Sequence, residues 1–205
     1  MDHKRILALD ISTKTGWALM VSGPEGIELK EYGTQPKITE PEGKYPINYV
    51  DWAYACFNRL LELINRLTPD VLVIEETSSG SKSAYSQKIL EFIHFLVANY
   101  LKTSSIETIY LMTETWRRET GCVMSDAEKK KNKEVRKYKK LNESKIAYDN
   151  NGKRIGIVGR KHVNVRRANE VFGKFLKEPL RKKDEDTADS LMLGYCYHLR
   201  RMRFV

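Results

Sequence analysis

The chain has 205 residues, of which 41% are hydrophobic and 31% charged, a composition typical of a folded globular protein rather than a disordered one. No apolar run approaches the roughly 20 residues of a membrane-spanning helix, so composition argues against a membrane protein. The formal net charge of +9 is concentrated, because residues 126–183 hold 20 Lys and Arg against 7 Asp and Glu while the remainder carries a balance of −4. This local positive charge favours a polyanionic partner.

The first 35 residues have the pattern of three short strands. The expected strands cover residues 5–10, 17–21 and 27–33. Turns that contain Gly16 and Gly26 separate them, and a loop rich in proline, glycine and charge follows at residues 35–46. The apolar stretch of the first strand is too short for a signal peptide and has no small-residue cleavage site after it. We therefore expect an intracellular protein, cytoplasmic or associated with the nucleoid, or in the host cytoplasm if the source is viral.

Two helices and two further strands are expected in the middle of the chain. Apolar residues recur at helical spacing over residues 47–67 and 84–101. A continuous apolar run at 71–74 is typical of a strand that is buried on both faces, and 108–112 reads as a short fifth strand. The three cysteines form no CxxC pair, so neither a disulfide framework nor a zinc site is expected.

The pattern weakens after the fifth strand. Residues 126–160 are mostly basic and polar, and we expect them to form an exposed, partly mobile arm. Helices are expected again at 163–176 and 186–200. This order of elements predicts an α/β fold, with a mixed five-stranded sheet flanked by helices. We expect a single domain over residues 1–205, with a basic insertion at about 123–160.

Four carboxylates stand where they can form a metal site. Asp10 ends the first strand, and Glu75 directly follows the apolar run of the fourth. Asp186 and Asp189 are three residues apart, so they project from one face of the last helix. Clustered carboxylates repel one another unless a cation neutralises them, and Mg²⁺ prefers such oxygen ligands. Their order along the chain therefore predicts an acidic metal pocket.

Each acidic residue also has a structural interpretation. Asp10 can cap the glycine-containing turn that follows it. Acidic residues at 184–186 can stabilise the start of the last helix, whereas Asp189 lies a turn inside it. Because side chains alternate along a strand, Glu76 is expected to point away from Glu75, to solvent or to a basic neighbour. The combination of four carboxylates, rather than any one of them, favours the metal site.

In the order strand-Asp, strand-Glu and C-terminal Asp-x-x-Asp, the chain resembles the RuvC family of Holliday junction resolvases. The resemblance implies a ribonuclease H-like fold and an endodeoxyribonuclease that cuts four-way junctions or related branched DNA, leaving 5′-phosphate and 3′-hydroxyl ends. It also implies Mg²⁺, for which Mn²⁺ can substitute, as two ions about 3.5 to 4 Å apart in each active site. In that family pattern Asp10 bridges the ions, Glu75 and Asp186 complete their shells, and Asp189 helps to hold the ion that activates water.

Basic residues are candidates for contacts to DNA phosphates. Lys82 lies in the loop after Glu75, Arg118 follows the fifth strand, and Lys161 precedes the penultimate helix. The last two fall where RuvC-like proteins carry basic residues. The lysine-rich run at 129–140 is a further candidate, although most such runs are solvated surface.

The resemblance also has consequences for partners and alternatives. A four-way junction has approximate two-fold symmetry, so we expect a homodimer, to which the helix at 84–101 can contribute. Many family members place an aromatic residue three positions after the strand glutamate, where this chain has Ser78, and Tyr85 is a weak candidate to replace it. The alternatives are a ribonuclease H that acts on RNA/DNA hybrids and a non-catalytic nucleic-acid-binding scaffold of the same fold.

Overall fold

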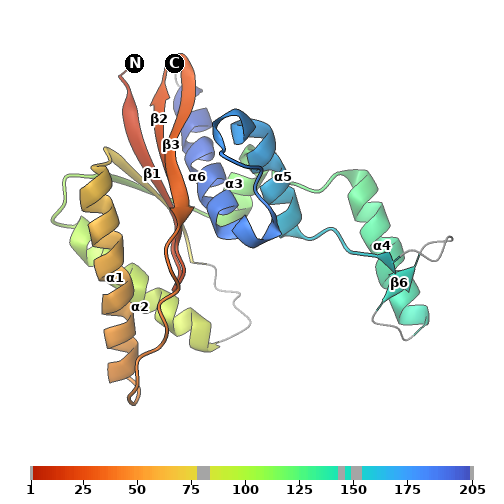
Figure 1. Cartoon of the computed structure of the whole chain (residues 1–205), viewed down its shortest axis with the longest axis horizontal. Helices are drawn as coiled ribbons and strands as arrows, with labels where there is room; N and C mark the ends of the chain where they lie inside the picture. Colours follow the sequence, from red (N-terminus) through yellow and green to blue (C-terminus); the bar gives the residue numbers. More distant parts are fainter. Residues whose placement is uncertain (1, 78–83, 143–145, 149–153, 204–205) are drawn as a thin grey trace.

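The computed structural model describes residues 2–77, 84–142, 146–148 and 154–203, and it contains a mixed five-stranded sheet with helices on both faces (Figure 1). The strands of this sheet are β1 (Lys4–Asp10), β2 (Gly16–Gly23), β3 (Gly26–Thr34), β4 (Val71–Glu75) and β5 (Glu107–Leu111). The helices are α1 (Ile47–Leu67), α2 (Ala84–Leu101), α3 (Thr113–Glu119), α4 (Asp126–Leu141), α5 (Arg160–Phe172) and α6 (Glu185–Met202). Two 3-10 turns, η1 (Gly173–Phe175) and η2 (Lys182–Asp184), and a strand pair, β6 (Ala147–Tyr148) with β7 (Arg154–Ile155), complete the described elements. The α/β architecture with five strands is confirmed.

The strand order β3-β2-β1-β4-β5 places β1 and β4 at the centre of the sheet. β1 pairs antiparallel with β2, and β4 runs parallel to both β1 and β5. In the β1–β4 register Ile6 lies opposite Val71 and Leu9 opposite Ile74. The next position in that register brings Asp10 beside Glu75, so the carboxyl ends of the two central strands carry an acidic residue each.

Both faces of the central strands are buried, which explains their unbroken apolar sequence. Ile6 and Ala8 face α6, α5 and α3, whereas Leu7 and Leu9 face α1 and α2. α6 lies close against the sheet because Gly194 has no side chain: a Cβ there would meet the Met20 sulfur at 2.7 Å. The helix that carries two of the predicted carboxylates is therefore fixed to the sheet. Among the described residues, none of the helices combines the length and apolar character that a membrane span requires.

The expected arm at residues 126–160 is exposed, but its first part is regular, since it forms the 16-residue helix α4, which was not predicted. A capping box begins this helix: the Ser125 side chain accepts from the Glu128 backbone, and the Glu128 side chain accepts from the Ser125 backbone. Lysine, arginine and glutamate dominate the helix and all have good helix propensity. The helix lacks the apolar stripe that sequence periodicity detects, which is why it was not predicted. α5 also differs, because it starts at Arg160 and ends at Phe172, where η1 takes over.

Candidate metal centre

Three of the four predicted carboxylates meet at the carboxyl ends of β1 and β4. One carboxylate oxygen from each of Asp10, Glu75 and Asp189 lies within 4.8 Å of the other two. Asp10 and Glu75 come from neighbouring strand ends, and Asp189 reaches them from the second turn of α6. The three side chains are separated by more than 60 residues between each pair along the chain, so only the fold brings them together.

The protonation of these groups reflects their crowding. Burial raises the pKa of Asp10 well above its ordinary value, and the negative charges of Glu75, Asp189 and Asp186 raise it further. Burial also raises the pKa of Asp189 to about 6, although the Asn164 amide and the Arg117 guanidinium oppose that rise. The cluster therefore carries a free-energy cost that either a proton or a cation can relieve.

Glu75 is held by two donors from α3. The Thr113 hydroxyl donates a hydrogen bond to Glu75 Oε1, and the Trp116 indole Nε1 donates to the same oxygen at 3.2 Å. α3 is in turn fixed to α6, since Arg200 makes a bidentate ion pair with Glu119 at 2.8 and 2.9 Å. Both bonds reach one oxygen of Glu75, and the Glu75 carboxylate also forms a hydrogen bond with Asp10 that contributes to the raised pKa of Asp10.

Asp189 is held in the same way from α5 and α3. Asn164 Nδ2 donates to Asp189 Oδ1 at 2.7 Å, and the Arg117 guanidinium lies 3.6 Å from Oδ2. The Asp189 side chain is only 13% exposed. Two atoms of these supporting side chains, Asn164 Oδ1 and Arg117 Nε, are buried and have no hydrogen-bond partner among the described residues.

Asp186 lies beside the cluster but is not one of the three residues whose oxygens converge. Its carboxylate faces Lys14 Nζ at 3.4 Å, and its charge contributes to the raised pKa of Asp10. Gly16 permits this arrangement, because a Cβ at that position would lie 2.1 Å from the Asp186 carbonyl oxygen. The start of β2 therefore determines how closely the first turn of α6 approaches Asp10.

A hollow of about 980 Å³ opens over two of the carboxylates. Its lining includes Asp10 and Glu75 together with Arg118 and Arg160, which belong to α3 and α5. Neither arginine makes an ion pair with any described residue, so both cations are available to an anionic ligand. An extended anion such as a nucleic-acid strand could thus contact the arginines while one of its phosphates reached the acidic cluster.

The remaining residues that the sequence singled out near the site do not all line this hollow. Lys161 is bonded to Glu185, at the start of α6, and is not among the residues that line the hollow. Lys82 and Ser78 lie outside the described residues. Glu76 is exposed, as expected, yet it borders the same hollow as Glu75.

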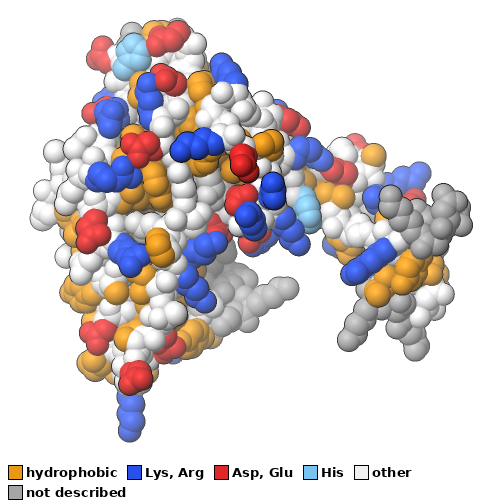
Figure 2. Space-filling model, in the orientation of Figure 1, with side chains coloured by type: hydrophobic (Ala, Val, Ile, Leu, Met, Phe, Trp, Pro, Cys, Tyr) orange, Lys and Arg blue, Asp and Glu red, His pale blue; other side chains and the backbone are white. Residues whose placement is uncertain are grey.

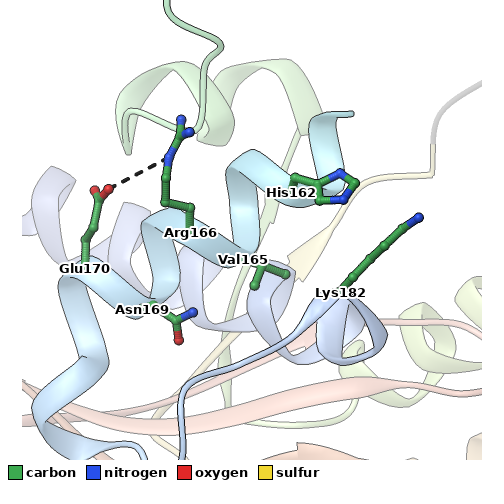
Figure 3. A pocket seen from close by; sticks show the side chains of 6 residues that line it. All are labelled: His162, Val165, Arg166, Asn169, Glu170 and Lys182. Carbon is green, nitrogen blue, oxygen red and sulfur yellow. Dashed lines mark ion pairs between the residues drawn. The ribbon is translucent and has the colours of Figure 1, made fainter. Parts of the chain in front are cut away.

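A second hollow, of about 480 Å³, lies against α5 and η2 (Figure 3). His162 and Lys182 border it, while Arg166 lies 3.9 Å from Glu170 and pairs also with Glu128 at 2.6 Å. None of the clustered carboxylates lines this hollow. Arg166 is already paired with two acids, and the clustered carboxylates border the other hollow, so the hollow over Asp10 is the candidate site.

The residues present fit a hard divalent cation. The donor set consists of carboxylate oxygens, which suits Mg²⁺ or Mn²⁺ and not softer ions that require thiolate or imidazole. Burial and the neighbouring carboxylates raise the pKa of Asp10, and burial raises that of Asp189 despite the nearby Arg117, so a bound cation would offset a cost that the protein's own charges leave in place. The buried Asn164 Oδ1 without a partner supplies one further acceptor near Asp189.

Sequence reasoning did not anticipate the residues that hold the carboxylates, namely Thr113, Trp116, Arg117 and Asn164. α3 has only seven residues, too few for a periodic pattern. One signal was available for Asn164, which is completely buried between Val163 and Val165 in a stripe that is otherwise apolar. A polar residue in such a stripe usually has a specific partner.

Comparisons with known proteins identify the fold. The sequence matches no protein-family model, and no curated protein is a significant match. The structure matches Thermus thermophilus RuvC in complex with a Holliday junction substrate, with a TM-score of 0.60 and 11% identity over 97% of this chain and 96% of that one. A second Thermus thermophilus RuvC structure matches with a TM-score of 0.60 and 14% identity over the same shares of the two chains. The yeast mitochondrial Holliday junction resolvase matches with a TM-score of 0.53 and 14% identity, over 98% of this chain and 82% of that one. The chain therefore has the ribonuclease H-like fold of RuvC-like resolvases, as expected.

Proposed function

We propose that this protein is a divalent-metal-dependent endodeoxyribonuclease that resolves Holliday junctions or related branched DNA inside the cell. The observation that carries the proposal is the convergence of Asp10, Glu75 and Asp189 within 4.8 Å, from β1, β4 and α6. The same fold occurs in RuvC in complex with a Holliday junction substrate. Hydrolysis of a phosphodiester in this site would leave 5′-phosphate and 3′-hydroxyl ends.

Asp10, Glu75, Asp186 and Asp189 would hold Mg²⁺, or Mn²⁺ in its place, as two ions, which would supply an activated water and charge stabilisation for the departing 3′-oxygen. Asp10 would bind the metal as a carboxylate, so its raised pKa means that protons compete with the metal for this group. Glu75 would bind the metal through the carboxylate that Thr113 and Trp116 orient. Asp186 adds a fourth carboxylate, for which Lys14 is the present counter-ion.

The arginines at the rim of the hollow have a separate task. Arg118 belongs to α3 and Arg160 to α5, and both line the hollow together with Asp10 and Glu75. We expect them to bind the phosphates that flank the scissile one, which the carboxylates alone would repel. Lys161 and Lys82 are proposed to extend this contact on the DNA side.

A homodimer would supply the two active sites that opposed strands of a junction require. Phe95 on α2 is 69% exposed, and its neighbours Phe92 and Leu96 only partly pack against the core. An apolar side chain this exposed suits contact with the same helix of a second copy. A Phe95→Glu variant that remains dimeric by light scattering would contradict this assignment.

The proposed activity is tested with purified protein, Mg²⁺ or Mn²⁺, and labelled substrates of matched sequence. These substrates are a four-way junction, a Y-fork, a linear duplex and an RNA/DNA hybrid. We expect symmetric nicks in the junction with ligatable ends, and no cleavage in EDTA. Preferential cleavage of the RNA strand would instead identify a ribonuclease H. Binding to the junction with no cleavage in either metal would identify a non-catalytic scaffold.

A further inference from the structure

The segment between α3 and α5 forms a small lobe that consists of α4, β6 and β7. α4 and β6 stand well away from the five-stranded sheet in Figure 1, and Figure 2 shows the lobe as a separate mass joined to the body by a narrow connection. Its interior is small, with Val135 and Ala147 as its buried apolar side chains. The lobe adds nothing to the two cores that cover the sheet, so its presence needs an explanation other than stability.

Among the described residues, Asn132 and Glu128 of α4 connect the lobe to the body. Asn132 exchanges a pair of 2.8 Å hydrogen bonds with the backbone of Val158, on the segment that leads into α5. Glu128, in the first turn of α4, pairs at 2.6 Å with Arg166 on α5. α5 also carries Asn164, which holds Asp189. The orientation of α4 is therefore linked to the helix that supports the metal centre.

The outer face of α4 is strongly basic. The helix holds eight Lys and Arg against three Asp and Glu. At 100° per residue, Lys130, Lys133, Lys137 and Lys140 fall within about 80° of arc, opposite the buried Asn132 and Val135. All four lysines are exposed, and none makes an ion pair with another described residue.

The distribution of acids shows that this charge is left uncompensated. Of the three acidic residues on α4, Asp126 pairs with Lys129 and Glu128 pairs with Arg166. Only Glu134 remains to balance the four lysines, and it is exposed. Like charges on one helix face reduce its stability, so a face of this kind fits a polyanion better than it fits solvent.

The geometry favours duplex DNA as that polyanion. A 16-residue helix is about 24 Å long, which equals the length of about seven base pairs. Two apolar side chains of α4 are exposed, Tyr138 at 38% and Leu141 at 72%, and both lie near its C-terminal end. They do not form the continuous apolar face with which an amphipathic helix enters a membrane interface. Lys and Arg side chains also gather on the body beside the connection to the lobe (Figure 2), so positive charge extends from the lobe toward the body.

We propose that the lobe is a second DNA-binding surface, which holds a duplex arm of the substrate by its phosphates through Lys130, Lys133, Lys137 and Lys140, apart from the site of hydrolysis. This inference rests on the proposed function, because it assumes branched DNA as the substrate. Phosphate contacts of this kind carry affinity without reading sequence. The lobe therefore acts on binding and not on the chemical step.

The test replaces the four lysines by glutamine, which has similar helix propensity and removes four charges. The control replaces four lysines outside the lobe in the same way, at Lys4, Lys30, Lys102 and Lys177. Binding to a four-way junction is measured over a range of salt concentrations in Ca²⁺ or EDTA, so that no cleavage is needed. Cleavage is measured separately, in single turnover with saturating protein.

For the lobe variant we expect the slope of log K against log salt to fall by about 3 to 4, and affinity at low salt to fall at least about tenfold. The single-turnover rate at saturation should stay within about threefold of that of the unsubstituted protein. Arms shortened to a few base pairs should abolish the difference, because they no longer reach the lobe. The control variant should show a smaller loss that does not depend on arm length.

An unchanged affinity and salt slope in the lobe variant would overturn the inference, and so would a loss identical to that of the control. The inference would also be overturned, in favour of a membrane partner, if the lobe variant bound the junction normally but no longer bound anionic lipid vesicles that the unsubstituted protein binds. A failure of the proposed nuclease activity would be recognised separately. In that case the unsubstituted protein would not cleave the junction, even if it bound the junction normally. Far-UV circular dichroism of the variant establishes that α4 remains helical.

Discussion

Replacement of Asp189 by asparagine should stabilise the metal-free protein above pH 6. Folding raises the pKa of this carboxyl from 3.8 to about 6, a rise of roughly two units at about 1.4 kcal/mol each, so the charged form costs about 3 kcal/mol of folding free energy. An asparagine oxygen can still accept from Asn164 Nδ2, which donates at 2.7 Å in the unsubstituted protein. The ion pair with Arg117, at 3.6 Å, would be lost. The net gain should therefore be about 1 to 2 kcal/mol.

The sign and pH range of this effect follow from the direction of the shift. Below about pH 3, well under the ordinary pKa of 3.8, Asp189 is protonated in both the folded and the unfolded chain, so it costs nothing. As pH rises, the unfolded chain ionises first, and the folded protein loses stability until the pKa of about 6 is passed. The advantage of the variant should accordingly be about 1 kcal/mol larger at pH 7.5 than at pH 5.

Urea unfolding in EDTA at these two pH values measures the difference. A gain of 1 to 2 kcal/mol corresponds to a rise in Tm of about 2 to 8 °C for a chain of this size. Asp51→Asn, at an exposed position of α1, provides a matched control that should show no gain dependent on pH. A variant at Asp189 that is less stable at pH 7.5, or whose gain is the same at both pH values, would refute the reasoning.

Four further outcomes follow from the site. Mg²⁺ should raise the Tm of the unsubstituted protein more at pH 7.5 than at pH 5, because protons compete for the carboxylates, and a shift independent of pH would argue against them as ligands. Asp10→Asn should abolish junction cleavage and leave binding intact or tighter; normal cleavage would exclude Asp10 as a ligand. Thr113→Val should weaken metal affinity about 10- to 100-fold through a misoriented Glu75, whereas Thr113→Ser should retain it, as metal titrations would show. Gly16→Ala should push Asp186 away, because its Cβ would lie 2.1 Å from that residue's carbonyl oxygen, and cleavage should fall at least about tenfold in a protein that still folds, which retained activity would contradict.

The positions of Asp10 and Glu75 could be predicted because apolar runs mark buried strands and each run ends in an acid. The residue spacing also placed Asp186 and Asp189 on one helix face. Spacing cannot show that the two differ in depth, since that depends on how closely α6 approaches β2 at Gly16. The residues that donate hydrogen bonds to the carboxylates could not be predicted either. α3 has only seven residues, too few for a periodic sequence pattern, and a single threonine such as Thr113 gives no signal of its own.

The lobe shows a second limit of sequence reasoning. Periodicity detects helices by their apolar stripe, and α4 buries only Asn132 and Val135. On its inner face, Asn132 donates a hydrogen bond to the Val158 carbonyl oxygen and accepts one from the Val158 N–H. Sequence composition does not reveal a polar contact of this kind. A helix of this sort is recognised better by its capping box, Ser125 with Glu128, which the sequence does display.

The central claim is that Asp10, Glu75 and Asp189 hold a divalent cation. The most direct test is a crystal soaked in Mn²⁺ and measured at a wavelength where manganese scatters anomalously. The account predicts an anomalous peak within coordination distance of all three carboxylates. A well-ordered site with no peak there, at a Mn²⁺ concentration that supports cleavage, would contradict it.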